Sequence, residues 1–565
     1  MRLPLKDRAT PLFFLAAAVF ITLAIIGGIR SYSPVPFADM WNGYLDFYIQ
    51  ALGGNWGVWW AQHNEHRILL SRIFFWLDLH FFEGRIWFLL AVNYALTAAT
   101  CLVFFLAIRE QTQGRQHWPV FFVTAWLFSW AQHQNLTWGF QSQFIMAQLI
   151  PLAAFYCLHR AAEPERKTIG AFILAVTLGL ASTATMANGI LAMPLMTLLA
   201  MLLRMSWKRH AILIAASICS ITLYFQGYSH PGGHGSLFKT VAETPLSCLQ
   251  FISLYLGGPF FHFLGGGNAG FWIAMISGFA LICIAAVLAC KEVAGSERSS
   301  LRLSLLTFIL YIGGTAFGTA GSRLAFGLRQ AFEGRYSTPA LMAWAALFVI
   351  MLPHFLGAKK ERLLSPRVLF FCLLLAALPM QIKALTPRHD AHFERTIGAL
   401  SLELEAKDSQ QIMAVFPFPD WAVSLAKTPS KLNLSIFGLT PIKDARERLN
   451  APAPLRSISS SNIGSIDAMY LIPDDQRFIG VRGWFFDREG KRTPEMVEFV
   501  NQEGLVVGLA LTGQPRPDVA AQVDPQAARC GFKGYLLSSA LGQTVELRDS
   551  QGRPGFSIQL PTARQ

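Results

Sequence analysis

Residues 12–29 read LFFLAAAVFITLAIIGGI, a run of eighteen positions without one charged side chain. A helix needs about 20 predominantly apolar residues to cross a hydrocarbon core of about 30 Å, so this run has nearly the length of a membrane span. Basic residues precede it at Arg2, Lys6 and Arg8, as in a signal peptide, but no small-x-small cleavage site stands before Arg30. We therefore predict a retained first transmembrane helix.

Similar apolar runs recur up to Leu385, and only 14% of the 565 residues in the chain are charged. Five further long apolar runs are Ile86–Ile108, Gly270–Cys290, Leu303–Thr319, Thr338–Leu356 and Val368–Leu385. Five weaker runs are Trp118–Ala131, Phe144–Leu158, Thr168–Ala184, Ile190–Leu203 and Ala211–Phe225. Together they predict a polytopic α-helical membrane protein with about 11 transmembrane helices.

Two more apolar stretches decide the orientation. Ile68–Phe82 and Leu246–Leu264 are interrupted by polar or Gly/Pro positions, so we assign both to the outer surface as juxtamembrane or re-entrant segments. An odd number of spans then places everything after Leu385 outside. With a cytoplasmic N-terminus, the clusters of Lys and Arg in alternate loops fall inside, as the positive-inside rule requires; these loops contain Arg109, Lys208, Lys291 and Lys360. This topology accounts for the net charge of +13, and no nucleic-acid partner is expected.

After Leu385 the sequence takes on the character of a soluble protein. Residues 386–455 combine an amphipathic helix-like stretch with two short apolar runs, Ile412–Phe416 and Leu432–Phe437, which predicts an external α/β segment. A Ser-rich linker follows at Arg456–Ser465.

Residues 467–565 alternate short strand-like runs with turns. Strands are expected at Gly480–Phe486, Met496–Val500 and Leu505–Leu511. A length of about 100 residues is normal for a β-sandwich. The predicted organisation is therefore a transmembrane domain at 1–385 with a first outer loop at 30–85, an α/β segment at 386–455 and a sandwich at 467–565.

The outer segments carry arginines that break the charge rule, and an anionic ligand at the membrane surface would explain them. The segment from Arg329 to Ser337 holds Arg329 and Arg335, and the first outer loop holds Arg67. A guanidinium offers a rigid fork of donors that suits a phosphate. The alternative is a salt bridge of Arg335 with Glu333 or Asp39.

A carboxylate stands soon after the first helix, at Asp39 in the stretch Phe37–Tyr44 that also contains Trp41. A general base that deprotonates an acceptor hydroxyl needs a position just above the membrane. The alternative is that Asp39 caps an interfacial helix running to Leu52, and the two roles are compatible.

The stretch Trp59–Arg67 mixes aromatic rings with hydrogen-bonding groups, including His63, Glu65 and His66. The zinc-protease signature spaces its histidines at i and i+4, so the spacing here does not fit it. A divalent metal held together with a phosphate remains an alternative. The paired tryptophans fit interfacial anchors equally well.

A loop rich in amides and aromatic rings lies at Asn135–Gln143, with Trp138, Gln141 and Gln143. Amides and aromatic faces suit sugar hydroxyls and ring faces. A buried polar cluster that joins helices is the alternative.

These features resemble GT-C type membrane glycosyltransferases: many spans, a long first outer loop with an acidic residue soon after the first helix, and a late outer Arg335-Tyr336 before a helix. The resemblance implies Asp39 as the base, with Arg335, and then Arg329, at the phosphate of a polyprenyl-phosphate sugar donor. Some members carry a second acidic residue beside the first, whereas Met40 follows Asp39 here, so the resemblance leaves a metal requirement open.

The function we expect is transfer of a sugar from a polyprenyl-phosphate donor to a lipid-linked glycan or cell-surface polysaccharide, at the outer face of a bacterial inner membrane. Asp39 and Glu65 are the catalytic candidates. Donor phosphate contacts are expected from Arg67, Arg329, Arg335 and Tyr336, and sugar or acceptor contacts from Trp41, His63, His66, Trp138, Gln141 and Gln143. A transporter, flippase or polymerase of lipid-linked saccharides is the alternative. No Gly-rich phosphate loop supports direct use of a nucleotide.

Overall fold

The structure is a computed structural model that describes residues 9–163, 168–229, 237–295, 298–356, 365–454 and 462–562. Lys360 and most of the Ser-rich linker lie outside the described residues. The chain forms two compact units. The helical unit comprises Met1–Tyr32, Trp59–Phe74 and Trp87–Thr386, and the barrel unit comprises Ser33–Val58, Phe75–Ile86 and Pro387–Gln565.

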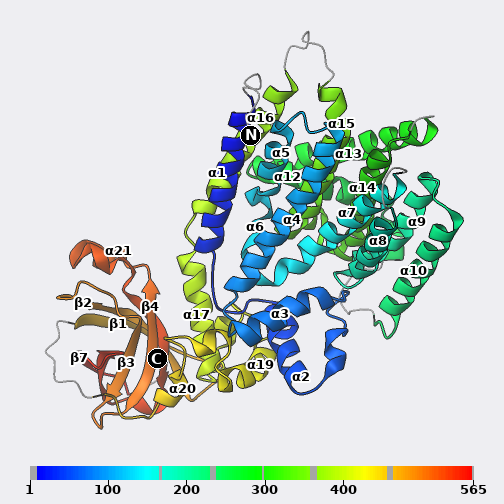
Figure 1. Ribbon diagram of the computed structural model, residues 1–565. Helices are drawn as coiled ribbons and strands as arrows, with labels where there is room; N and C mark the ends of the chain where they lie inside the picture. The colour runs from blue at the N-terminus through cyan, green and yellow to red at the C-terminus, as the bar shows by residue number, and fades with distance from the viewer. Residues whose placement is uncertain are drawn as a thin grey trace. The chain divides into compact units, whose positions relative to one another are not determined.

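In the described part of the chain, seven helical stretches are long and apolar enough to cross a membrane, and all lie in the helical unit (Figure 1). They are α1 (Ala9–Arg30), α4 (Trp87–Gln111), Gly139–Ala162 with α7 (Ser142–Ala162), α13 (Gly267–Ala294), Ser300–Phe326 with α14 (Ser300–Arg323), Gly334–Leu356 with α15 (Ser337–Leu356), and Pro366–Leu385 with α16 (Pro366–Ile382). The six strongest apolar runs all fall within these helices.

The predicted count of about 11 spans is not confirmed. Trp118–Ala131 yields α5, a helix of 10 residues at Trp118–Leu127. Two other weak runs yield α8 (Thr168–Ser182) and α9 (Ala192–Leu202), which are shorter than a span, and the last yields α10 (Trp207–Phe225). Length separates α5, α8 and α9 from the seven long helices, whereas α10 has 19 residues but carries Lys208, Arg209 and His210 in its first turn and is less apolar.

The Gly/Pro positions of the second ambiguous stretch, Gly257, Gly258 and Pro259, do not end its helix, and its assignment to the outer surface stays a prediction. That stretch forms α12, one continuous helix at Pro245–Phe263. A Cβ on Gly257 would lie 1.8 Å from the carbonyl oxygen of Ala274, in α13. Small residues let helix backbones approach closely, so this glycine serves packing against α13 and does not end the helix.

The barrel unit joins two pieces of the first outer loop to the C-terminal region. The loop contributes a π-helical turn (Trp41–Leu45) and α2 (Asp46–Leu52), so the helix ends at Leu52 as expected. The C-terminal helices are α17 (His389–Glu403), α18 (Ser409–Ile412), α19 (Pro419–Lys431) and α20 (Ala445–Arg448). The amide of Ala38 donates to the Val415 carbonyl at 2.8 Å, which ties the two parts together.

The predicted strands at Ile412–Phe416 and Leu432–Phe437 do not form. Between 387 and 454 the described residues contain no strand, and the two runs fall in α18 and in turns. Short apolar runs of buried residues have the same composition in either structure, so their period cannot distinguish a strand from a buried turn or helix end.

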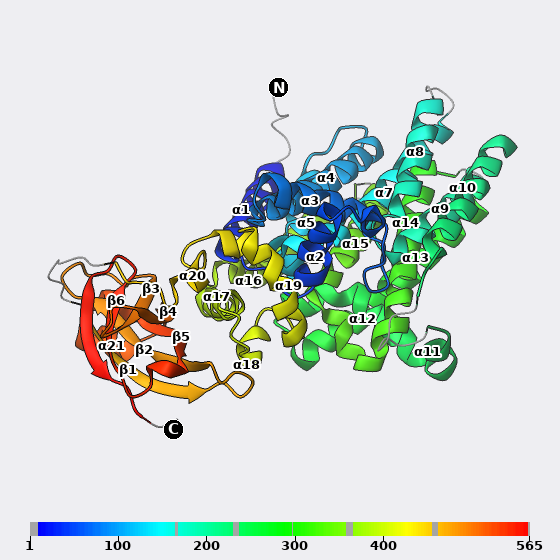
Figure 2. The ribbon, with the colours of Figure 1, turned by 90° about the horizontal axis from the view of Figure 1, so that it is seen from below.

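The strands after residue 462 form one antiparallel sheet of seven strands in the order β1-β2-β5-β4-β3-β6-β7 (Figure 2). Their bounds are β1 (Asn462–Leu471), β2 (Phe478–Asp487), β3 (Met496–Asn501), β4 (Val506–Gln514), β5 (Gly531–Leu537), β6 (Thr544–Asp549) and β7 (Pro554–Gln559). The side-chain amide of Asn462 donates to the backbone carbonyls of Arg553 and Pro554, so the two edge strands meet at one end. The expected two-sheet sandwich is therefore a single sheet rolled into a nearly closed barrel.

Candidate functional site

A tight turn at His63–His66 organises the histidine stretch. The amide of His63 donates to the carbonyl of His66 at 2.8 Å, and the reverse bond is 2.9 Å. Asn64 has φ of 50°, a left-handed conformation that asparagine tolerates better than most residues. The turn therefore fixes the directions in which the side chains of His63, Glu65 and His66 project.

His63 is buried and packs edge-on against the ring of Phe140, with ring centroids 5.3 Å apart. Burial, followed by the nearby charge of Arg72, lowers the pKa of His63 to about 3. The imidazole is therefore neutral at physiological pH. Its buried Nε2 has no hydrogen-bond partner among the residues that the structure describes.

Glu65 and His66 are half-buried. Glu65 Oε1 lies 3.3 Å from Arg323 and 3.8 Å from His66 Nε2. His66 Nδ1 accepts the amide of Ala187 at 3.3 Å, so in a neutral ring the proton is on Nε2. The ligand-type atoms of His63, Glu65 and His66 do not come together as a group of three in the described structure. The proposed function below therefore assigns no metal to this turn.

Arg67, predicted from the sequence as a phosphate contact, has its guanidinium bonded within the protein in this structure. It is 4% exposed, and its guanidinium donates to the carbonyls of Trp60, Tyr224 and Gln226 at 2.6, 2.7 and 2.5 Å. Rings of Trp60 and Tyr224 flank it within 6 Å. Every nitrogen of the fork is thus used to hold the turn against the chain after α10.

Arg335 differs from Arg67 because its guanidinium forms no hydrogen bond or ion pair with any described residue. Its carbon Cζ lies 6.0 Å from the ring centre of Phe144 and 5.5 Å from that of Tyr336. The buried Nε has no partner in the part of the chain described. The backbone around it is fixed by Gln134, which accepts the Arg335 amide at 2.8 Å. Of the expected alternatives, no salt bridge to Glu333 forms among the described residues.

Arg329 and Tyr336 lie in the same segment in different surroundings. Arg329 is exposed, whereas Tyr336 is buried with its ring stacked 5.2 Å from Tyr255. Tyr336 thus packs the segment in place, and of the two arginines Arg335 has the enclosed position.

The amide-rich loop of the sequence forms α6 (His133–Thr137), a 3-10 turn (Gly139–Gln141) and the start of α7. Asn135 is buried and donates to the Arg335 carbonyl at 2.9 Å and to Thr338 at 2.6 Å. Trp138 is half-buried, and its carbonyl accepts from Asn93 at 3.0 Å. These bonds place the Arg335 segment beside the start of α7.

Gln141 and Gln143 are the most unusual residues of this loop. Gln141 is 0% exposed, yet neither its amide oxygen nor its amide nitrogen has a hydrogen-bond partner among the described residues. The same holds for the oxygen of Gln143, which is 3% exposed. Ser142 between them is satisfied, because it bonds to Ser71 at 2.9 Å.

We call His63, Gln141, Gln143 and Arg335 the α7 polar cluster, because each belongs to Gly139–Phe144 or contacts a ring in it. Buried polar atoms without partners are rare, since each costs about 1–3 kcal/mol. Several of them at one helix start, together with an enclosed cation and aromatic rings, fit a polar and anionic ligand. The sequence pointed to these four residues, but missed Asn135 as the link and Arg323 as the partner of Glu65, since both are long-range contacts.

Asp39 and Trp41 lie in the barrel unit. Asp39 is half-buried and follows Ala38, whose φ is 48°. The Asp39 carbonyl accepts the Gly43 amide at the start of the π-helical turn. Trp41 is 0% exposed and its indole donates to the Pro36 carbonyl at 3.0 Å. In this structure the Trp41 ring is a packing residue, and its role in sugar binding stays a prediction.

No protein-family model matches the chain, and no curated protein matches it. Among solved structures, an oligosaccharyltransferase of Archaeoglobus fulgidus in the apo form is similar, with a TM-score of 0.39 and 12% sequence identity. The similarity covers 74% of this chain, which spans 60% of that enzyme's length.

Proposed function

We propose that the protein transfers a sugar from a polyprenyl-phosphate donor to a lipid-linked glycan or cell-surface polysaccharide, at the outer face of a bacterial inner membrane. The observation that carries this proposal is the α7 polar cluster. Amides and a neutral imidazole without protein partners suit hydroxyl groups, and an unpaired guanidinium suits a phosphate. The seven apolar helices fit a protein embedded in the membrane, where a polyprenyl-phosphate donor also resides.

In this proposal Arg335 holds the donor phosphate, while Gln141, Gln143, His63 and the half-buried Trp138 contact sugar hydroxyls. The acceptor hydroxyl attacks the anomeric carbon and the bond from that carbon to the phosphate oxygen breaks. The hydroxyl proton passes to a carboxylate, and the phosphate leaves as an anion beside Arg335.

Asp39 is the carboxylate we propose as the base. Glu65, the other candidate, already lies in an ion pair with Arg323, which ties the turn to the end of α14. His66 faces Glu65 and completes the same group. Arg329 is exposed and serves at most the approach of the donor.

The test is Asp39→Asn in a deletion strain, with mass analysis of surface glycans and an immunoblot of the membrane fraction. Asparagine caps a helix as well as aspartate does, so a capping role predicts little effect. Loss of a general base predicts a rate lower by about 10² to 10⁴, with normal amounts of protein in the membrane.

Asp46→Asn is the matched control, because Asp46 is also half-buried and accepts from Gln50 at 2.7 Å one turn further on. Arg335→Lys keeps the charge but loses the fork, and should weaken donor use by about tenfold. Unchanged glycans in the Asp39→Asn strain would remove Asp39 as the base. Movement of a saccharide without any new covalent product would favour the transporter alternative.

A further inference from the structure

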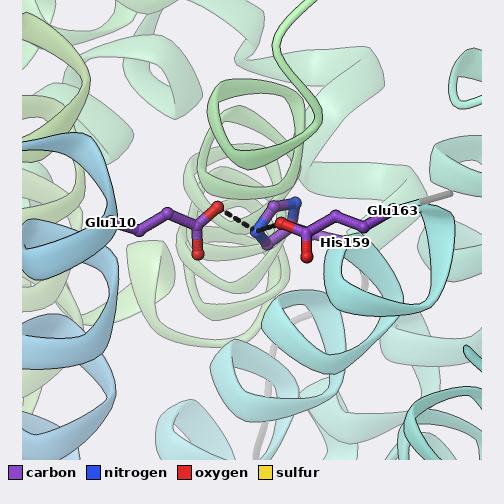
Figure 3. A group of neighbouring side chains, drawn as sticks. All are labelled: Glu110, His159 and Glu163. Carbon is purple, nitrogen blue, oxygen red and sulfur yellow. Dashed lines mark ion pairs between the residues drawn. The ribbon is translucent and has the colours of Figure 1, made fainter. Parts of the chain in front are cut away.

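A second group of polar side chains lies in the helical unit, at the last turns of α4 and α7 (Figure 3). Glu110 lies in the last turn of α4 and His159 in the last turn of α7. Glu163 is the residue that directly follows α7. One ligand-type atom from each lies within 4.8 Å of the others. None of the three belongs to the α7 polar cluster, and the proposed transfer uses none of them.

The imidazole of His159 stands between the two carboxylates. Its Nε2 lies 2.8 Å from Glu110 Oε1 and 3.8 Å from Glu163 Oε1 (Figure 3). The His159 side chain is 2% exposed, and the short contact to Glu110 lacks the geometry of a hydrogen bond, so Nε2 has no hydrogen-bond partner among the described residues. A buried nitrogen aimed at two carboxylate oxygens without a hydrogen bond is the arrangement that a bound cation would satisfy.

Groups outside the three side chains hold each of them in this orientation. Ser300, at the start of α14, lies 2.8 Å from His159 Nδ1 and thereby fixes the ring. Arg160 lies 3.1 Å from Glu110 Oε2 and 3.6 Å from Glu163 Oε2, and Tyr156 donates to Glu110 Oε2 at 3.3 Å. The outer oxygens are therefore occupied, and the Oε1 atoms are those that face the histidine. Partners of this kind orient metal ligands in known sites.

We propose that Glu110, His159 and Glu163 bind one divalent transition-metal ion of the Zn²⁺ or Mn²⁺ type, which joins the ends of α4 and α7. One imidazole with two carboxylates suits these ions better than Ca²⁺ or Mg²⁺, which prefer oxygen ligands alone. Metal–ligand bonds of about 2.1 Å place neighbouring ligand atoms about 3.4 Å apart in a tetrahedron. The two distances at Nε2 lie on either side of that value, so small side-chain rotations would close the site.

The test measures metal in tag-free, detergent-purified full-length protein. After incubation with Zn²⁺ and removal of loosely bound ions, elemental analysis should find one additional Zn²⁺ per chain compared with protein stripped by a chelator. Zn²⁺ should also raise the thermal midpoint. Glu163→Gln should weaken Zn²⁺ binding at least tenfold and abolish the thermal shift; Glu110→Gln should do the same.

Glu292→Gln is the matched control, because Glu292 also pairs with an arginine, Arg302, at a helix end but has no histidine beside it. It should retain full Zn²⁺ binding. If Glu110→Gln does not fold, Glu163→Gln still decides, because Glu163 is partly exposed and lies further from the histidine. Wild-type protein that binds no Zn²⁺ or Mn²⁺, or a Glu163→Gln variant that binds Zn²⁺ like wild type, would show an ion-pair network only.

Discussion

Two buried glutamines, Gln411 in the barrel unit and Gln141 in the helical unit, have opposite surroundings. Gln411 donates to the carbonyl of Glu394 at 2.7 Å and to its carboxylate at 3.1 Å, and it accepts from the Lys533 ammonium. The Gln141 side chain is equally buried, but its amide oxygen and nitrogen have no hydrogen-bond partner in the described structure. The difference separates a polar group that holds the fold from one that our proposal assigns to a ligand.

Among the changes that test this comparison, the largest effect we expect is on stability, from Gln411→Leu. This change removes one acceptor of the buried Lys533 ammonium and a partner of Glu394. Leaving a buried charged group short of a partner costs about 2–3 kcal/mol, or roughly 30- to 150-fold in the opening equilibrium. Hydrogen exchange of the β5 and α17 amides in the full-length protein measures it. Gln522→Leu, at an exposed glutamine, is the control, and equal protection in both variants would contradict a structural role for Gln411.

A smaller effect, of the opposite kind, is expected from Gln141→Leu. The change breaks no bond within the protein, so the thermal midpoint should stay the same or rise. Sugar transfer should fall about tenfold, because one ligand hydrogen bond worth about 1.4 kcal/mol is lost. Glycan analysis and thermal unfolding of the same preparation measure the pair of effects. A drop in stability as large as that of Gln411→Leu would mean that Gln141 also holds the fold.

Asp78, at the end of α3 (Leu69–Phe81), lies between these extremes and gives the smallest effect. Its Oδ2 accepts from Tyr44 at 2.5 Å and from the Ile86 amide at 3.2 Å, while Oδ1 is buried without a partner among the described residues. Burial raises the pKa of Asp78 to about 6, against the hydrogen bonds that lower it. The protonated form is therefore favoured in the folded state.

The sign of the pH dependence follows from this raised pKa. The group's contribution to stability is complete below the unfolded value near pH 4 and is lost as the pH rises through about 6. Asp78→Asn avoids the buried charge, so it should be more stable than wild type by about 1 kcal/mol at pH 7.5 and lose that advantage by pH 4.5. Thermal unfolding at both pH values checks it, and a variant less stable at pH 7.5 would contradict the assignment.

Local pattern was enough for the elements whose signal is long. Leu12–Ile29 became α1 (Ala9–Arg30), and the expected strand Met496–Val500 became β3 (Met496–Asn501). Short runs failed, because Ile412–Phe416 is apolar through burial under other elements and not through strand alternation. The role of Gly257 could not be read from the local sequence either, because it depends on the carbonyl of Ala274 in another helix.

The candidate site shows the same limit. The sequence nominated His63, Gln141, Gln143 and Arg335 by residue type, and each of the four lies in Gly139–Phe144 or contacts a ring of that segment. It also nominated Arg67, which the structure assigns to three backbone carbonyls. Composition tells which side chains can bind a phosphate or a sugar, but only long-range contacts reveal which of them the fold has already used.

The barrel unit is built from segments that lie far apart in the sequence, and this sets the order in which they are synthesised. Ser435 bonds to the carbonyl of Pro34, which lies 401 positions earlier in the chain, and Trp41 packs against Phe437. At about 5–20 residues per second, the ribosome needs on the order of 20 to 80 seconds to make the second partner after the first. During that time the apolar side chains of the first outer loop have been made while their final neighbours do not yet exist.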